Sequence, residues 1–115
     1  MSAAGDPNFA ITIERRGELR AVSVAGELDL STAPQFEAAM REQLEAGPVS
    51  LHLDQLSFMD SSGVRALHAL LPARSAEPPR LTISPALQDS VRQVLKMTGM
   101  LELLLDDVAT REGGR

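Results

Sequence analysis

Apolar and polar residues alternate along the start of the chain with a period of two, which is typical of β-strands. Phe9, Ile11 and Ile13 alternate within the run FAITIER, and Val22 shares one face with Val24 in the run LRAVSVAG. The intervening RGEL supplies a glycine where the chain must reverse. The pattern therefore predicts a β-hairpin.

The spacing of apolar residues then changes to that of an amphipathic helix. This change predicts a helix over residues 33–45, with Phe36 and Met40 on its inner face. Thr32 and Gln35 have the spacing of a capping box, in which two side chains satisfy the free N–H groups at a helix start. We therefore expect the helix to begin just after Thr32.

The remaining sequence continues to change between the two periods. It predicts, in order, a strand over residues 49–56, a helix that begins in the DSSG segment, a loop over 72–79, a strand over 80–84, a helix opened by Pro85 and ended near Gly99, and a final strand over 101–107. Strands that alternate with helices favour an α/β fold, here a single domain over residues 8–109. Residues 1–7 and 110–115 are predicted to be flexible tails.

Composition narrows the class of function. The net charge of −5 and an aromatic content of 3% disfavour binding to nucleic acid, which favours basic surfaces and stacking side chains. The chain has no cysteine, which excludes thiol chemistry and agrees with a cytoplasmic protein. No apolar run has the length of a membrane span, and no secretory signal is visible at the N-terminus. We therefore expect a cytoplasmic protein with neither a nucleic-acid nor a membrane partner.

The sequence offers little for catalysis or metal binding. Neither His52 nor His68 has metal-ligand spacing to another candidate ligand, and neither is placed to take a proton from Ser61. The chain contains no nucleotide-binding glycine motif and no GxSxG nucleophile elbow. We expect no enzyme activity, no metal and no cofactor. An enzyme that uses Asp29, Asp60 and Ser61 is an alternative with thin support, because no base or metal cluster accompanies them.

The segment SFMDSSGVRAL places polar residues where an apolar strand gives way to a helix. Asp60 or Ser61 can cap that helix, because their side-chain oxygens accept first-turn N–H groups. The same geometry exposes the Ser61 hydroxyl, and unpaired amides at a helix start can accommodate a phosphate. Gly63 is expected to leave the backbone open to an approaching partner. A cap is the more frequent use of such a segment, so the residues alone leave both readings open.

Three segments together resemble the STAS domain, specifically the bacterial anti-sigma-factor antagonists. VAGELDLSTAPQFEAAM resembles the family's segment before its first helix, VSLHLDQLSFMDSSGV its central strand and phosphorylation loop, and LTISPALQDSVRQVLKMTGMLELL its late strand and third helix. They follow the family's order and cover most of residues 9–105. The resemblance implies a mixed four- to five-stranded sheet with helices packed mainly on one side.

The resemblance also implies a mechanism of partner switching, of the kind used in stress responses and transcription regulation. In that family the unphosphorylated antagonist binds an anti-sigma factor that is itself a serine kinase, and the sigma factor is released. The kinase phosphorylates the antagonist and ejects it, and a serine phosphatase restores it. Matched position by position, Ser61 is the phosphoacceptor, and the implied partner-binding residues are Glu27, Asp29, Asp60, Ser61, Ser62, Gly63 and Arg65.

Two features leave room for other functions. Arg65 stands where many family members have a small residue, so it could alter which kinase is recognised or offset part of the phosphate charge. The family also includes STAS subunits that dock on the ATPase of a lipid-transport complex without being phosphorylated. Such a subunit is the alternative to a phosphorylation switch for this chain.

Overall fold

The computed structural model describes residues 8–106 of the chain. Along this part the elements are, in order, β1 (Phe9–Arg16), β2 (Leu19–Leu28), α1 (Ala33–Ala46), β3 (Val49–Met59), α2 (Ser61–His68), α3 (Leu71–Ser75), β4 (Leu81–Ile83), α4 (Asp89–Met97) and the π-helical turn η1 (Glu102–Asp106). The tails predicted over residues 1–7 and 110–115 lie outside the described residues, as does the end of the predicted domain. Within the described part, no helix is long and apolar enough to cross a membrane.

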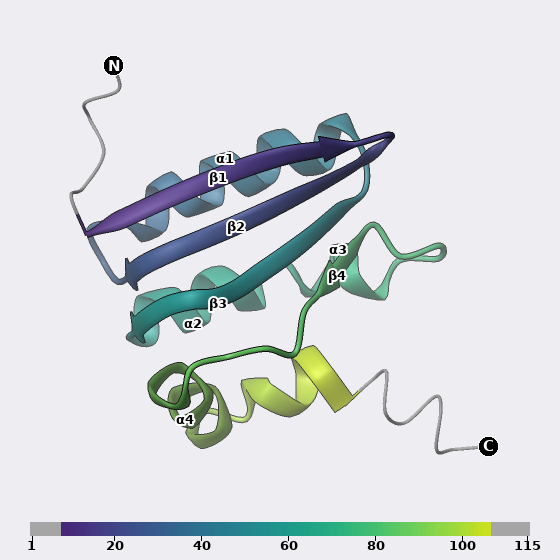
Figure 1. The fold of residues 1–115 in the computed structure, drawn as a ribbon. Helices are drawn as coiled ribbons and strands as arrows, with labels where there is room; N and C mark the ends of the chain where they lie inside the picture. The colour runs from purple at the N-terminus through teal and green to yellow at the C-terminus, as the bar shows by residue number, and fades with distance from the viewer. Residues whose placement is uncertain (1–7, 107–115) are drawn as a thin grey trace.

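The four strands form one mixed sheet in the order β1-β2-β3-β4. β1 runs antiparallel to β2, whereas β2, β3 and β4 are parallel to one another. Figure 1 shows α1 and α2 on the same face of the sheet, and α4 beside the part of β3 that extends past β4. This arrangement confirms the predicted α/β fold, with a mixed sheet and helices mainly on one side.

The predicted hairpin is present, and its register explains the alternation in the sequence. Ile11 pairs with Val24 and Ile13 pairs with Val22, so these side chains share the face that the helices cover. Gly17 turns the chain with φ at +67°, in the left-handed region that glycine adopts without steric cost. The hairpin thus follows directly from a period of two and one glycine.

The core between the sheet and the helices is aliphatic apart from two phenylalanines. Phe36 and Met40 on α1 are fully buried, and so are Val22, Leu51 and Leu56 on the strands. Burying one such side chain contributes about 1.5–3 kcal/mol. This layer therefore supplies the main driving force that holds α1 against the sheet, as the apolar stripe of the predicted helix requires.

Side chains at the start of α4 complete the edge of β3 that the short β4 leaves unpaired. Gln88 Nε2 donates to the Asp54 carbonyl at 3.0 Å, and Ser90 Oγ donates to the Ser57 carbonyl at 2.7 Å. The connection from β4 must run beside β3 to place these donors. The helix consequently begins at Asp89, later than the sequence predicted.

The loop predicted over residues 72–79 begins with a short helix instead. α3 spans Leu71–Ser75 and carries Pro72 in its first turn. Proline is tolerated there because the N–H group that it lacks would have no partner within the helix. The prediction of a loop is therefore wrong for residues 72–75, which belong to α3.

The final strand predicted over residues 101–107 is wrong, because Glu102–Asp106 form a π-helical turn. Leu104 is buried and Leu101 and Leu105 are half-buried, whereas Leu103 is exposed. The inward leucines therefore have helical spacing. Leu101, Leu103 and Leu105 alternate as residues on one face of a strand do. The same run also has leucines at helical spacing, so the pattern fits both a strand and a helix.

Candidate functional site

The DSSG junction, defined here as residues 60–63, lies directly beside the bend that follows β2. The ends of β2 and β3 pair in parallel, and the Asp60 N–H donates to the Leu28 carbonyl at 3.3 Å. Because parallel strands have their carboxyl ends on the same side of the sheet, the bend that carries Glu27 and Asp29 lies next to the junction. Two acidic segments that are far apart in the sequence therefore meet beside the carboxyl ends of β2 and β3.

Asp60 caps α2. Its Oδ1 accepts hydrogen bonds from the N–H of Ser62 at 2.8 Å and the N–H of Gly63 at 3.3 Å, and its carbonyl accepts from the N–H of Val64. The cap that the residues predicted is thus present. The expectation that unpaired amides here would accommodate a phosphate is wrong for Ser62 and Gly63, because the Asp60 carboxylate already occupies both.

Ser61 is the first residue of α2, and it is exposed. Among the described residues, none forms a hydrogen bond with its hydroxyl. Arg65 lies four residues later on the same helix face and is also exposed, whereas Ser62 is half-buried. The structure therefore presents a reachable hydroxyl between a carboxylate that is fixed in place and an exposed guanidinium.

Gly63 is buried and faces the protein's own strands. A Cβ placed on Gly63 would lie 2.6 Å from Met59 Cγ and 2.8 Å from the Leu28 carbonyl oxygen. The expectation that Gly63 leaves the backbone open to a partner is therefore wrong. Its lack of a side chain instead lets α2 start close against the ends of β2 and β3, which fixes the position of Ser61.

Asp29 organises the bend between β2 and α1. Its Oδ1 accepts from the Ser31 hydroxyl at 2.9 Å and from the N–H groups of Ser31 at 3.1 Å and Thr32 at 3.2 Å. The Thr32 hydroxyl donates to the Glu27 carbonyl at 2.8 Å and accepts from the Asp29 N–H at 2.9 Å. Because Thr32 is engaged in the bend, the capping box predicted with Gln35 is not formed, and α1 begins without a side-chain cap.

The hydrogen bonds to Asp29 make the stability of the protein depend on acid pH. The Ser31 hydroxyl is the main donor that lowers the pKa of Asp29 below its ordinary value of 3.8, with partial desolvation opposing and Thr32 assisting. Because the pKa of Asp29 is lower in the folded protein than in the unfolded chain, the charged carboxylate stabilises the fold at pH values above the unfolded pKa. This contribution is lost as the pH falls through the lowered pKa of the folded state. We predict that the melting temperature falls less between about pH 5 and pH 2 in Asp29→Asn than in the wild type. Glu42→Gln, which removes an exposed carboxylate from α1, should follow the wild-type pH profile, and equal profiles for all three proteins would contradict the prediction.

Two exposed apolar side chains lie on the segments beside the DSSG junction, and neither was predicted from the sequence. Leu30 in the bend is 74% exposed, and Phe58, which pairs with Glu27 near the end of β3, is 46% exposed. Exposed apolar side chains beside a candidate site are typical anchors of a protein interface. The sequence carried a signal for Phe58, because it precedes Met59 and adjacent residues of a strand face opposite sides.

Other arrangements that would suggest catalysis lie away from Ser61. Over residues 8–106, no group of three or more acidic or histidine side chains is arranged to hold a metal ion. His52 Nε2 is hydrogen-bonded with Ser50 Oγ at 2.7 Å on β3, and His68 is the exposed last residue of α2. The serine–histidine pair that the structure contains is thus on the sheet rather than at the DSSG junction.

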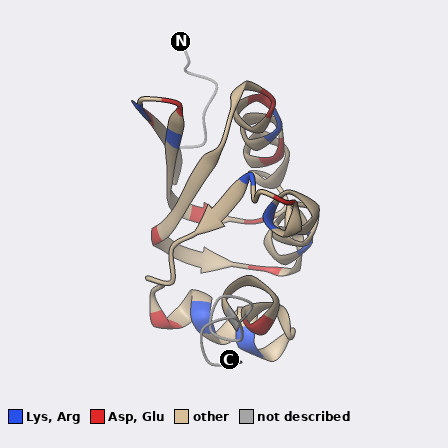
Figure 2. Ribbon diagram, turned by 90° about the vertical axis from the view of Figure 1, so that its right-hand side faces the viewer, with Lys and Arg blue, Asp and Glu red and all other residues tan. Residues whose placement is uncertain are grey.

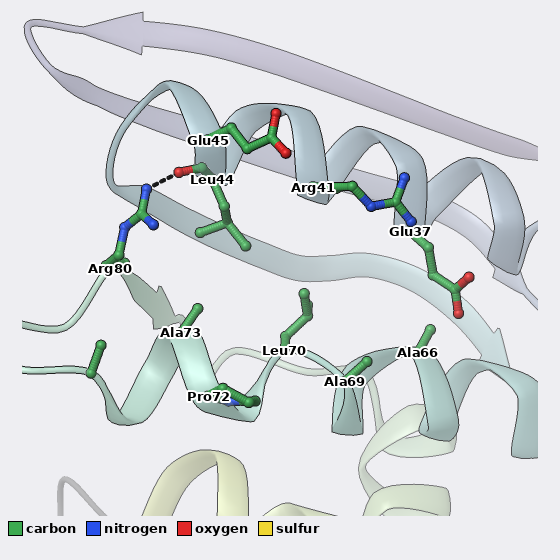
Figure 3. Close-up of a pocket in the computed structure, with 11 residues that line it drawn as sticks. Glu37, Arg41, Leu44, Glu45, Ala66, Ala69, Leu70, Pro72, Ala73 and Arg80 are labelled. Atoms are coloured by element: carbon green, nitrogen blue, oxygen red, sulfur yellow. Dashed lines mark hydrogen bonds between the residues drawn. The ribbon is translucent and has the colours of Figure 1, made fainter.

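A cavity of about 640 Å³ lies between α1 and the α2–α3 segment. Figure 3 shows Leu44 and Leu70 pointing into it, with Arg80 at one end, where its guanidinium donates to the Leu44 carbonyl. None of the predicted site residues lines this cavity. Figure 2 shows acidic and basic residues interspersed over the helices and the hairpin.

Comparison with protein families and curated sequences identifies relatives of the whole domain. The family model described as "Mlab, STAS domain" matches residues 11–106. The anti-sigma-B factor antagonist of Staphylococcus aureus (strain NCTC 8325 / PS 47) is 26% identical over 99 residues, which span 84% of this chain and 91% of that protein. The similarity therefore extends over the sheet, the helices and the junction together.

Solved structures share the same arrangement. An anti-sigma factor antagonist from Mycobacterium paratuberculosis gives a TM-score of 0.69 at 25% identity and covers 92% of this chain and 96% of that one. The anti-sigma factor antagonist SpoIIAA in its unphosphorylated form gives 0.65 at 23% identity, covering 92% and 98%. SpoIIAA of Bacillus in its phosphorylated form gives 0.59 at 24% identity, covering 79% and 85%.

Proposed function

The chain belongs to the STAS domain family, and on this premise we propose that it is a cytoplasmic anti-sigma factor antagonist controlled by phosphorylation of Ser61. The unphosphorylated form binds an anti-sigma factor that is also a serine kinase, and the sigma factor is released. Phosphorylation of Ser61 by that kinase ejects the antagonist, and a serine phosphatase restores it. The protein itself acts as a regulatory binding module rather than as an enzyme.

The observation that supports this proposal best is the exposure of the Ser61 hydroxyl beside a carboxylate already bound to its own helix. Asp60 satisfies the amides of Ser62 and Gly63. A phosphate on Ser61 would therefore add charge of about −1.5 to −2 at pH 7 without those amides to receive it. The added charge would act on whatever protein covers the junction.

The surroundings of Ser61 suit a protein partner. Leu30 and Phe58 offer exposed apolar area on the two segments that meet at this edge. Contact surfaces commonly combine such apolar anchors with polar groups at their rim. Glu27 and Asp29 supply acidic groups at this rim; both residues are half-buried, and the Asp29 carboxylate is held by Ser31 and Thr32. A partner that binds around Ser61 would thus bury apolar area and would contact the hydroxyl that is proposed to be phosphorylated.

A phosphorylation assay tests the proposal. Kinases captured on the immobilised protein, incubated with ATP and the free protein, should add one phosphate, which intact-mass analysis and peptide mapping should assign to Ser61. Ser61→Ala should take up no phosphate. Ser75→Ala, which removes an exposed hydroxyl on α3, should be modified as the wild type is.

Two results would contradict the proposal. A phosphate mapped to another hydroxyl would show that Ser61 is not the acceptor. Capture of the ATPase of a lipid-transport complex, with no phosphate transferred, would favour the alternative in which the same edge docks an ATPase permanently.

A further inference from the structure

β1 forms one edge of the sheet, and its outer side is unpaired. Within residues 8–106, this eight-residue strand pairs with β2 alone. Sheet edges in monomeric proteins are usually protected by a bulge, a proline or charged residues. The β1–β2 register is uninterrupted and β1 contains no proline, so only the charged residues Glu14, Arg15 and Arg16 at its end provide such protection.

The register shows which backbone groups of β1 point away from β2. The Glu27 N–H donates to the Asn8 carbonyl at 2.8 Å, which makes Asn8 and Glu27 a hydrogen-bonded pair. Hydrogen-bonded pairs alternate along an antiparallel ladder, so Ala10, Thr12 and Glu14 direct their backbone groups toward β2. The residues between them direct their N–H and carbonyl groups outward: Phe9, Ile11, Ile13 and Arg15.

We propose that this edge pairs with β1 of a second copy of the chain, antiparallel, about a two-fold axis at Thr12. Ile11 then faces Ile13 of the second copy, and Phe9 faces Arg15, so every outward backbone group from 9 to 15 gains a partner. The face that carries the helices is the same in both copies, because paired residues all differ by an even number of positions. The result is one continuous sheet through the dimer.

The side chains favour this register over those whose axis lies nearer the end of β1. With the axis at Thr12, two threonines pair across the axis and no like charges stand directly opposite, which are both favourable in antiparallel sheets. Moving the axis to Ile13 places Ile11 opposite Arg15, and moving it to Glu14 or Arg15 places two identical charges opposite each other. With the axis at Thr12, Ile13, which is 42% exposed in the single copy, lies opposite Ile11 of the second copy.

This dimer is a weak one, and it does not depend on the proposed function. A single strand pair lies at the lower end of interface sizes, so the dimer should form in a concentration-dependent way. The ends of β2 and β3, where Ser61 lies, are not part of the paired edge. Each dimer therefore presents two DSSG junctions to its partners.

Cross-linking tests the register directly, since the chain has no cysteine of its own. Thr12→Cys places one thiol at the axis in a pair that is not hydrogen-bonded, where Cα atoms lie about 4.5 Å apart, within disulfide range. We expect oxidation of Thr12→Cys to give a covalent dimer. The matched control Thr82→Cys, at an exposed position on β4, should stay monomeric under the same oxidation. Equal yields from both variants would overturn the proposal.

Sedimentation equilibrium tests the dimer without a cross-link. The wild-type mass should rise from 12.3 kDa toward twice that value as concentration increases. Ile13→Pro removes an outward N–H, and Ile13→Lys puts a charge opposite Ile11 of the second copy, so each should raise the dissociation constant by about tenfold or more. Thr82→Lys should leave it unchanged. A wild-type protein that stays at 12.3 kDa at every concentration, or a dimer indifferent to Ile13→Lys, would overturn the proposal.

Discussion

Ser61→Asp should weaken binding to the anti-sigma factor by about a hundredfold or more, which corresponds to roughly 2.8 kcal/mol, whereas Ser61→Ala should bind within a few fold of the wild type. Alanine removes a hydroxyl with no hydrogen bond in the described structure, so the fold and the surface survive. Aspartate puts a second carboxylate beside Asp60, whose own charge is committed to the α2 cap. A charge buried without a partner under an interface costs several kcal/mol.

Calorimetric titration against the anti-sigma factor of the proposed function measures this effect. Ser75→Asp provides the matched control, because it adds the same charge at an exposed position on α3, away from the junction. It should change the affinity by less than threefold or so, as expected for a remote surface charge. Equal affinities of wild type and Ser61→Asp would show that the partner does not cover this hydroxyl.

Gly63→Ala should lower the free energy of unfolding by about 2 kcal/mol, which lowers the melting temperature by roughly 10 °C. In most helices this substitution is stabilising, because alanine has the higher helix propensity. Here the new methyl group would lie 2.8 Å from the Leu28 carbonyl oxygen, and this backbone atom cannot move without disturbing the β2–β3 pairing. We therefore expect the steric cost to exceed the gain in propensity.

Gly47→Ala is the matched control for this prediction. The nearest atom to a Cβ at Gly47 is Nη1 of Arg20 at 3.0 Å, at the far end of a flexible side chain. Its cost should stay below about 1 kcal/mol. Thermal and chemical unfolding of both variants decide the matter, and a Gly63→Ala protein as stable as the wild type would show that α2 can shift away from the strands.

The fold could be predicted where one periodicity dominated the sequence. In the β1–β2 hairpin, apolar residues alternate and one glycine turns the chain, so no other element fits the pattern. The leucines after Gly99 fit both a strand and a helix, and packing against the domain selected the helical set. The start of α4 could not be predicted because it depends on carbonyl groups of β3 that lie more than thirty residues earlier.

The site was predictable in part for the same reason. A helix cap and an exposed serine both follow from the residue types in DSSG, and the structure contains both. The burial of Gly63 depends on the position of Leu28 in a distant strand, which no local pattern contains. The exposure of Leu30 likewise depends on the bend that Asp29 stabilises. In this bend Thr32 bonds to the Glu27 carbonyl, whereas the sequence had assigned Thr32 to a capping box with Gln35.

The α2 cap has a consequence for how information would be stored in this molecule. Since the first turn is already satisfied by Asp60, neither addition nor removal of a group on the next side chain has to rearrange the backbone. The phosphorylated and unphosphorylated forms would share one backbone conformation and nearly the same melting temperature, and would differ in the charge that a partner meets. Repeated phosphorylation and dephosphorylation would therefore not expose the chain to misfolding.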